Sequence, residues 1–151
     1  MAEHRATITW ERSTDDFQYD TYDRNHRWAF ENGAEIAASA APDFLGDSAC
    51  IDPEEAFVAS LSSCHMLTFL AIAAKKRLKL DSYTDAAVGY LQKNEEGKLA
   101  MTEVILRPQV KFSGEKQPTP EQIEKMHHTA HENCFIALSV KTEVRVECPV
   151  S

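Results

Sequence analysis

The feature that most constrains the fold is a long apolar helix, predicted from Asp52 to about Leu78. No Gly or Pro interrupts the sequence after Pro53 in this segment. Asp52 suits the N-cap, Pro53 suits the first turn, and acidic residues 54 and 55 favour the positive end of the helix dipole. Apolar residues occur on almost every side of the segment, which is typical of a core helix. A chain of 151 residues can hardly bury such a helix alone, so the pattern favours a partner subunit.

Strands are expected before this helix. Alternating or β-rich patterns predict strands over residues 5–12, 17–22 and 26–31, and Asn32–Gly33 predicts a tight turn. Residues 37–42 are expected to lead into an irregular segment before the helix.

More strands and a second helix are expected after it. Residues 81–93 and 99–112 predict a hairpin whose turn contains a glycine. Thr119 is expected to cap a helix over 121–133, and clean alternation predicts a last strand over 136–146. The resulting order, βββ–α–ββ–α–β, is that of an α+β fold with β-sheets packed on one long helix. We expect a single domain over residues 1–151.

Charge and hydropathy exclude several classes of function. The net charge is −8, and an acidic surface repels phosphate backbones, so nucleic acid is not an expected partner. The first residues lack the apolar core of a signal peptide. The longest strongly apolar stretch, 66–74, is too short to span a bilayer. These patterns predict a cytoplasmic protein without a membrane partner.

The chain has four cysteines, Cys50, Cys64, Cys134 and Cys148. In a cytoplasmic protein of this size such cysteines are expected to be reduced, buried or catalytic. No Cys-x-x-Cys occurs, which argues against a zinc ribbon and against a thioredoxin motif. Cys50 precedes the long helix, and Cys148 lies near the end of the chain, so we interpret these two as a loop thiol and a tail thiol.

Cys64 and Cys134 are the candidate reactive thiols. Cys64 lies in Ser-Ser-Cys-His inside the long helix, and Cys134 ends the second helical pattern. Only a thiolate attacks a peroxide, and an ordinary thiol has a pKa near about 8.5. Because Cys64 is too deep in its helix to gain much from the helix dipole, a cation must lower its pKa, and arginine suits this role. If the fold joins the two sulfurs, the protein reduces a substrate by forming a disulfide.

Glu54 is the candidate carboxylate for orienting that arginine. Ten helical residues separate Glu54 from Cys64, which corresponds to about 15 Å along the axis and about 80° in direction. Glu54 therefore cannot easily reach Cys64 of its own helix. It could approach Cys64 of a second chain if two such helices pack antiparallel.

Other interpretations remain open. His127, His131 and Cys134 share a helix face, and with Cys64 and His65 they could bind zinc or another soft metal. A noncatalytic binding dimer would use both cysteines for packing. A thiol hydrolase or transferase using Cys64 with His65 is less well supported, since adjacent helical residues point about 100° apart.

The chain resembles the OsmC/Ohr family, the osmotically inducible protein C and organic hydroperoxide resistance proteins. Two segments carry the resemblance. One begins at Asp-Pro-Glu-Glu-Ala-Phe (52–57) and runs to Ser-Ser-Cys-His (62–65), and the other is His-Glu-Asn-Cys-Phe-Ile-Ala-Leu-Ser-Val (131–140). The resemblance implies an intertwined α+β homodimer with its active sites at the subunit interface. It also implies thiol-dependent reduction of organic hydroperoxides as the activity.

The resemblance assigns roles to individual residues. Cys64 matches the peroxidatic cysteine, Cys134 the resolving cysteine, and Glu54 the glutamate that orients an arginine. Arg24 is the best-placed arginine and Arg27 the second. No metal, flavin or haem is implied, and the expected reductant is an external dithiol, typically a lipoyl group on a protein.

The sequence also bears on the substrate. His65 follows the reactive cysteine where the hydroperoxide resistance proteins carry an aromatic residue, which indicates a separate, OsmC-like branch. Apolar residues expected near the site favour fatty or aromatic hydroperoxides over hydrogen peroxide; these are Phe57, Leu61, Met66 and Phe135.

Overall fold

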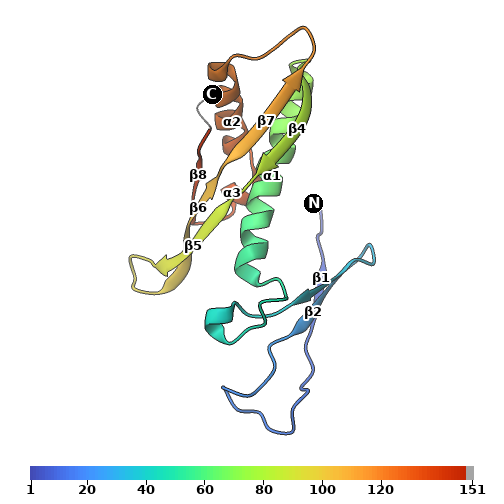
Figure 1. Cartoon of the computed structure of the whole chain (residues 1–151), viewed down its shortest axis with the longest axis vertical. Coiled ribbons are helices and arrows are strands. Elements are labelled where there is room, and N and C mark those ends of the chain that lie inside the picture. Colours follow the sequence, from blue (N-terminus) through green and yellow to red (C-terminus); the bar gives the residue numbers. More distant parts are fainter. Residues whose placement is uncertain (149–151) are drawn as a thin grey trace. The chain divides into compact units, whose positions relative to one another are not determined.

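The computed structural model describes residues 1–148 and confirms the predicted α+β architecture. The chain divides into two compact units, the first from Met1 to Ala56 and the second from Phe57 onward. Figure 1 shows the course of the chain. The first unit contains β1 (Ala6–Thr9), β2 (His26–Phe30), β3 (Glu35–Ala38) and the short 3-10 helix η1 (Pro42–Phe44). The helices are α1 (Pro53–Lys75), whose first residues belong to the first unit, α2 (Pro120–Glu132) and α3 (Phe135–Leu138). The strands after the first unit are β4 (Lys79–Asp85), β5 (Val88–Lys93), β6 (Leu99–Leu106), β7 (Pro108–Ser113) and β8 (Glu143–Val146).

The first unit is an antiparallel sheet in the order β1-β2-β3. The predicted turn at Asn32–Gly33 is confirmed, and Gly33 has a φ of +87°, which glycine adopts without steric cost. The strand predicted over 17–22 is wrong. The N–H groups of Thr21 and Tyr22 both donate to the Gln18 carbonyl, so this segment closes a local turn. Strand β3 was not predicted, and its last two residues overlap the segment 37–42 that we expected to lead into an irregular region.

Helix α1 has the ends that its sequence predicts. The Asp52 carboxylate accepts the Glu55 N–H at 2.8 Å, and the Glu55 carboxylate accepts the Asp52 N–H at 3.3 Å, which is a reciprocal cap. At the other end Arg77 adopts a φ of +60°, and the N–H of Leu78 reaches back to the Ala73 carbonyl. This Schellman end turns the chain sharply into β4.

The hairpin predicted after α1 is present, but each of its two predicted long strands is divided into two shorter strands. Strands β4 and β7 pair with each other, whereas β5, β6 and β8 form a separate sheet in the order β5-β6-β8. Asp85 marks the break, because its carboxylate accepts the backbone N–H of Arg107 at 2.7 Å, between β6 and β7. Gly97, with a φ of +78°, lies in the turn of the hairpin, as predicted.

The C-terminal segment confirms one prediction and corrects another. Thr119 caps α2 through a capping box with Gln122, as its position before the helix predicts. The last strand predicted over 136–146 begins too early. Its first residues form α3, where the Leu138 N–H donates to the Cys134 carbonyl, and only β8 pairs, parallel to β6.

The second unit buries a single stripe of α1. Leu61, His65, Phe69 and Ala73 recur every four residues and are buried. Phe69 and Ala73 pack with Met126 and Ala130 of α2, and Leu61 packs with Val104 and Leu106 of β6.

The rest of α1 is largely uncovered. Leu67 is 59% exposed. By length and composition α1 could cross a membrane, a property that it shares with core helices of soluble proteins. The expected partner subunit stays a prediction.

Candidate functional site

The structure brings Cys64 and Cys134 together. Cys64 lies in the middle of α1, and Cys134 lies between α2 and α3. The Cys64 side chain lies near enough to Cys134 to raise the pKa of the Cys134 thiol. Both thiols are free, so they form a reduced pair contributed by two elements that are far apart in the sequence.

The two thiols differ in exposure and environment. Cys64 is half-buried, whereas Cys134 has no exposed surface. Burial raises the pKa of Cys134, and its contact with Cys64 raises it further. The Cys134 sulfur also accepts the Ala137 N–H at 3.5 Å, because Cys134 is the N-cap of α3. Cys134 is therefore held as a protonated, inaccessible thiol beside a more accessible one.

The two serines before Cys64 have different environments. Ser62 donates to the Asp85 carboxylate at 2.5 Å and so ties α1 to the end of β4, whereas Ser63 is exposed. Thr68 donates to the Cys64 carbonyl at 3.0 Å, one turn further along α1. These contacts fix the backbone that carries Cys64.

His65 does not line the thiol pair. Its Nε2 lies 3.0 Å from Nδ1 of His127 on α2, and both rings are buried. The rings are nearly parallel, with centroids 5.3 Å apart, and His127 also stacks on Phe69 at 4.2 Å. Burial lowers the pKa of His65 to about 4, with a further contribution from His131, and burial beside His65 lowers the pKa of His127 to about 4. The pair is therefore neutral at pH 7, and one ring donates to the other.

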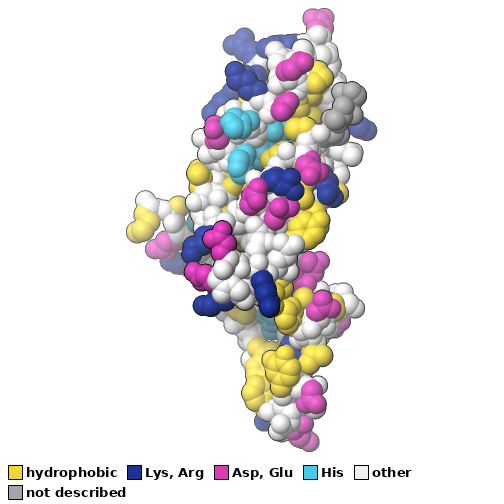
Figure 2. Space-filling view, turned by 90° about the vertical axis from the view of Figure 1, so that its left-hand side faces the viewer, with side chains coloured by type: hydrophobic (Ala, Val, Ile, Leu, Met, Phe, Trp, Pro, Cys, Tyr) yellow, Lys and Arg dark blue, Asp and Glu magenta, His cyan; other side chains and the backbone are white. Residues whose placement is uncertain are grey.

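The surroundings of this histidine pair are polar. Among the described residues, His65 Nδ1, His131 Nδ1 and the Tyr83 hydroxyl are buried without a hydrogen-bond partner. Beside them is a cavity of about 420 Å³ lined in part by His127, His131 and Cys148. Figure 2 shows histidine side chains reaching the surface close together on one face. Cys148, which we interpreted from the sequence as a tail thiol, is half-buried and lines this cavity, and burial raises its pKa.

Sequence reasoning missed the pairing of His65 with His127. One signal was available, because His65 falls on the same four-residue stripe as Leu61 and Phe69. A histidine on a buried stripe needs a polar partner. No pattern in the sequence identifies that partner as His127.

The metal alternative gains no support from geometry. Within residues 1–148, no group of three or more His, Cys, Asp or Glu side chains is arranged to hold a metal ion. His127, which the sequence places on one helix face with His131 and Cys134, uses its Nδ1 for His65 instead.

Arg24 belongs to the first unit and is engaged there. Its guanidinium lies 3.9 Å from the Tyr22 ring centre and 5.1 Å from that of Tyr19, and it donates to the backbone carbonyls of both. Two of its five N–H groups are used in this way. Arg27 instead faces Glu35 at 3.8 Å on the exposed sheet.

The two glutamates that begin α1 differ in availability. The Glu55 carboxylate is occupied by the helix cap, whereas the Glu54 carboxylate makes no hydrogen bond or ion pair with residues 1–148. Glu54 is half-buried. Because its carboxylate has no partner among the described residues, it is available to bind an arginine. Because Arg24 and Glu54 lie in the first unit and the cysteines in the second, their joint action remains a prediction.

Comparison with known proteins identifies the family. Residues 46–148 match the family model described as OsmC-like protein. An OsmC-like protein of unknown function from Vibrio cholerae is 56% identical, covers 99% of this chain and 100% of its own, and has a TM-score of 0.96. No curated protein matches.

More distant structures share the fold. An organic hydroperoxide resistance protein from Elizabethkingia anophelis is 20% identical, with a TM-score of 0.73, and covers 100% of this chain and 96% of its own. The organic hydroperoxide resistance protein OhrB of Bacillus subtilis is 15% identical, with a TM-score of 0.68, and covers 98% of both chains. With a family model that matches two thirds of the chain and a full-length relative at 56% identity, this chain belongs to the OsmC-like protein family.

Proposed function

We propose that this protein is a cysteine-based reductase of organic hydroperoxides. The observation that carries the proposal is that a half-buried Cys64 neighbours a fully buried Cys134. The names of two fold relatives, both organic hydroperoxide resistance proteins, support the same chemistry.

The reaction proceeds in three balanced steps. The Cys64 thiolate attacks one oxygen of R–O–O–H, the O–O bond breaks, and with one proton the products are an alcohol and a Cys64 sulfenic acid. The Cys134 thiol then attacks the sulfenic sulfur, forming a Cys64–Cys134 disulfide and releasing water. An external dithiol reduces this disulfide and is itself oxidised to a disulfide.

The difference in burial supports this division of roles. A peroxide can reach Cys64 from the solvent side, whereas Cys134 has no exposed surface. The raised pKa of Cys134 disfavours its thiolate, so it is a poor first nucleophile. Once Cys64 is a sulfenic acid, Cys134 is already beside it.

The thiolate of Cys64 needs a cation, which we assign to Arg24 oriented by Glu54. Arg24 keeps three N–H groups beyond its two carbonyl bonds, and the Glu54 carboxylate is free to accept from them. A homodimer would meet this need if its two α1 helices pack antiparallel. The uncovered apolar surface of α1 and the exposed aromatic residues of the first unit support such a partner.

The surface beside Cys134 favours an apolar substrate. Phe135 is 80% exposed and Leu138 is 70% exposed, both on α3. Phe57 and Met66 are half-buried, whereas Leu61 belongs to the core and cannot touch a substrate. We therefore propose fatty or aromatic hydroperoxides as substrates. An external lipoyl-type dithiol as reductant follows from the family resemblance, and a cytoplasmic location from the sequence pattern; both are part of the proposal. The mechanism uses no metal, flavin or haem.

Steady-state turnover tests the proposal. The protein is supplied with dihydrolipoamide and either cumene hydroperoxide or hydrogen peroxide, and peroxide loss is measured. We expect cumene hydroperoxide to be consumed faster, and Cys50→Ser, which changes a thiol of the other unit, to retain activity. Equal turnover of both peroxides would contradict the apolar preference. No turnover of either would contradict the function.

The dimer has its own test. Sedimentation at working concentrations should give twice the chain mass of 17.0 kDa. A monomer at these concentrations would remove the proposed role of Glu54.

A further inference from the structure

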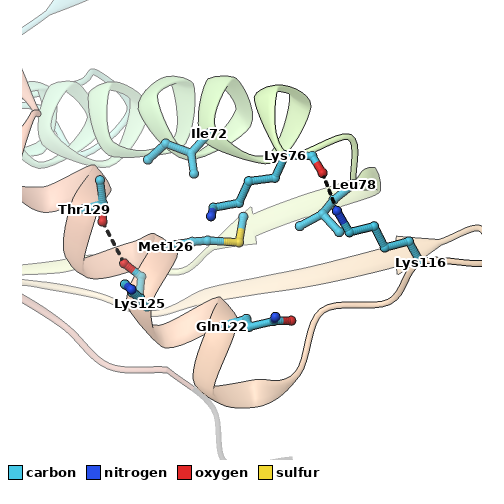
Figure 3. Close-up of a pocket in the computed structure, with 8 residues that line it drawn as sticks. All are labelled: Ile72, Lys76, Leu78, Lys116, Gln122, Lys125, Met126 and Thr129. Atoms are coloured by element: carbon cyan, nitrogen blue, oxygen red, sulfur yellow. Dashed lines mark hydrogen bonds between the residues drawn. The ribbon is translucent and has the colours of Figure 1, made fainter.

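A pocket lies at the C-terminal end of α1, beyond Cys64 along the helix. It is formed by the end of α1, the facing side of α2 and the loop between β7 and α2, all within the second unit (Figure 3). Its volume is about 390 Å³, which falls within the range of small-ligand sites. Neither Cys64 nor Cys134 lines this pocket, and Ile72, the lining residue of α1 nearest to Cys64 in the sequence, lies eight helical residues or about 12 Å further along.

The floor of the pocket is apolar. Ile72, Leu78 and Met126 line it, and all three belong to the cluster around Phe69 and Ala73 or pack against it. The Schellman end of α1 creates this floor, because the positive φ of Arg77 turns Leu78 back beneath the helix. An alkyl chain placed here would lie against side chains that pack on the hydrophobic core.

The rim of the pocket is positively charged. Lys76, Lys116 and Lys125 line it, and no Asp or Glu is among the lining residues. Within residues 1–148, none of the three lysines forms an ion pair. Lys116 donates to the Lys76 carbonyl at 2.9 Å, which holds its charge over the end of α1.

This arrangement is unusual in an acidic chain of net charge −8. A larger cavity of about 950 Å³ elsewhere in the unit is lined by Lys93 and Lys141, but also by Glu95 and Glu96, so its charges cancel. Basic side chains also gather at one end of the face drawn in Figure 2. Uncompensated cations above an apolar floor complement one class of ligand, an anion with an apolar tail.

We propose that this pocket binds a free single-chain amphiphile with an anionic head group, of which a medium-chain carboxylate is the simplest. The tail lies on Ile72, Leu78 and Met126, and the carboxylate is held by Lys76 and Lys125 with charge-assisted hydrogen bonds. Each buried methylene strengthens binding about fourfold, so affinity rises with chain length until the floor is covered. The site does not depend on the thiol chemistry of Cys64.

The test is a titration of the reduced protein, labelled with ¹³C at Ile and Met methyl groups, and followed by NMR. The probes are decanoate below its micelle concentration, decanol, propionate and vesicles of anionic lipid. We expect decanoate to shift the Ile72 and Met126 methyl signals. Decanol, which lacks the charge, and propionate, which lacks the tail, should each bind at least about tenfold more weakly.

A pair of variants separates charge from folding. Lys76→Gln with Lys125→Gln should weaken decanoate binding about tenfold or more while leaving the melting temperature nearly unchanged, since both side chains are exposed. Lys93→Gln with Lys141→Gln removes two lysines from the charge-balanced cavity and should leave binding unchanged. The proposal is overturned if decanol binds as tightly as decanoate, if the Lys76 and Lys125 changes have no effect, if the shifts occur elsewhere, or if only vesicles bind.

Discussion

Two pairs of side chains join α1 to the helical region near the C-terminus, and they differ in almost every physical respect. Cys64 with Cys134 is a pair in which one member is accessible and no strong bond holds the two together. His65 with His127 is a fully buried pair with a 3.0 Å hydrogen bond. Cys64 and His65 are neighbours in the sequence, and a helix points neighbours about 100° apart. Adjacent residues of α1 therefore have different roles: Cys64 is accessible enough to react, whereas His65 is part of the core.

This contrast explains why the hydrolase interpretation fails to gain support. A base for Cys64 would have to sit beside its sulfur, but His65 is directed at His127 and stays neutral at pH 7. We infer that the thiol pair determines activity, whereas the imidazole pair determines stability. Three measurements test that separation, and a fourth calibrates the size of the effects on stability.

The largest effect is expected at Cys64. Cys64→Ser removes the nucleophile, so peroxide consumption should fall by at least about a thousandfold, into the range expected when an essential catalytic group is lost. The melting temperature should change little, because serine is close in size to cysteine. Cys134→Ser should still react once with peroxide and then stop as a sulfenic acid. Full activity in Cys64→Ser would break the comparison, since the thiol pair would then have no catalytic role.

The second effect is a dependence of stability on pH. The pKa of His65 and of His127 is about 4 in the folded protein, whereas an unfolded histidine titrates near about 6.5. Between these values the unfolded chain binds more protons, so stability is complete above about pH 6.5 and is lost as the pH falls toward 4. The slope should reach up to about 1.4 kcal/mol per pH unit for each histidine. Denaturant titrations from pH 4.5 to 7.5 measure it, and a flat profile would contradict the buried neutral pair.

The third effect is the cost of separating the imidazoles. His127→Leu leaves both nitrogens of the buried His65 ring unpaired, which should cost about 1–3 kcal/mol of unfolding free energy. The same variant should keep its peroxide turnover, because within residues 1–148 neither imidazole is hydrogen-bonded to Cys64 or Cys134. His128→Leu is the matched control, since His128 is 71% exposed in its side chain and should stay within about 0.5 kcal/mol. Loss of turnover in a stable His127→Leu protein would show that the two pairs are not separate.

The smallest effect lies outside both pairs and calibrates the scale. Arg77 ends α1 with a φ of +60°, a region that glycine adopts without strain. Arg77→Gly should stabilise the protein by about 0.5–1 kcal/mol after the added freedom of the unfolded chain is counted. Lys75→Gly, inside the last turn of the helix, should have the opposite sign. Equal changes at both positions would mean that the helix end carries no strain.

The sequence predicted the elements whose signals are local. The cap at Asp52, the capping box at Thr119 and the turn at Gly97 each depend on a few adjacent residues, and all three are confirmed. The α+β order and the long central helix followed from them. The family resemblance is confirmed by the match over residues 46–148.

The errors occurred where distant residues decide the structure. The break between β4 and β5 depends on the contact of Asp85 with the Arg107 N–H, 22 residues away. The late start of β8 depends on Cys134 capping α3 and on pairing with β6. The partnership of His65 with His127 spans 62 residues. Such contacts leave no local pattern. The pairing of Cys64 with Cys134 was a hypothesis from the chemistry of two cysteines and from the family resemblance, and its catalytic role stays a prediction.

The most direct test of the central claim is intact-protein mass spectrometry with peptide mapping. One equivalent of cumene hydroperoxide is added to the reduced protein and to the Cys64→Ser and Cys134→Ser variants. The account predicts rapid loss of two hydrogens in the unmodified chain, mapped to a Cys64–Cys134 bridge, and a stable sulfenic acid in Cys134→Ser alone. No reaction at one equivalent, or a bridge between other cysteines, would contradict it.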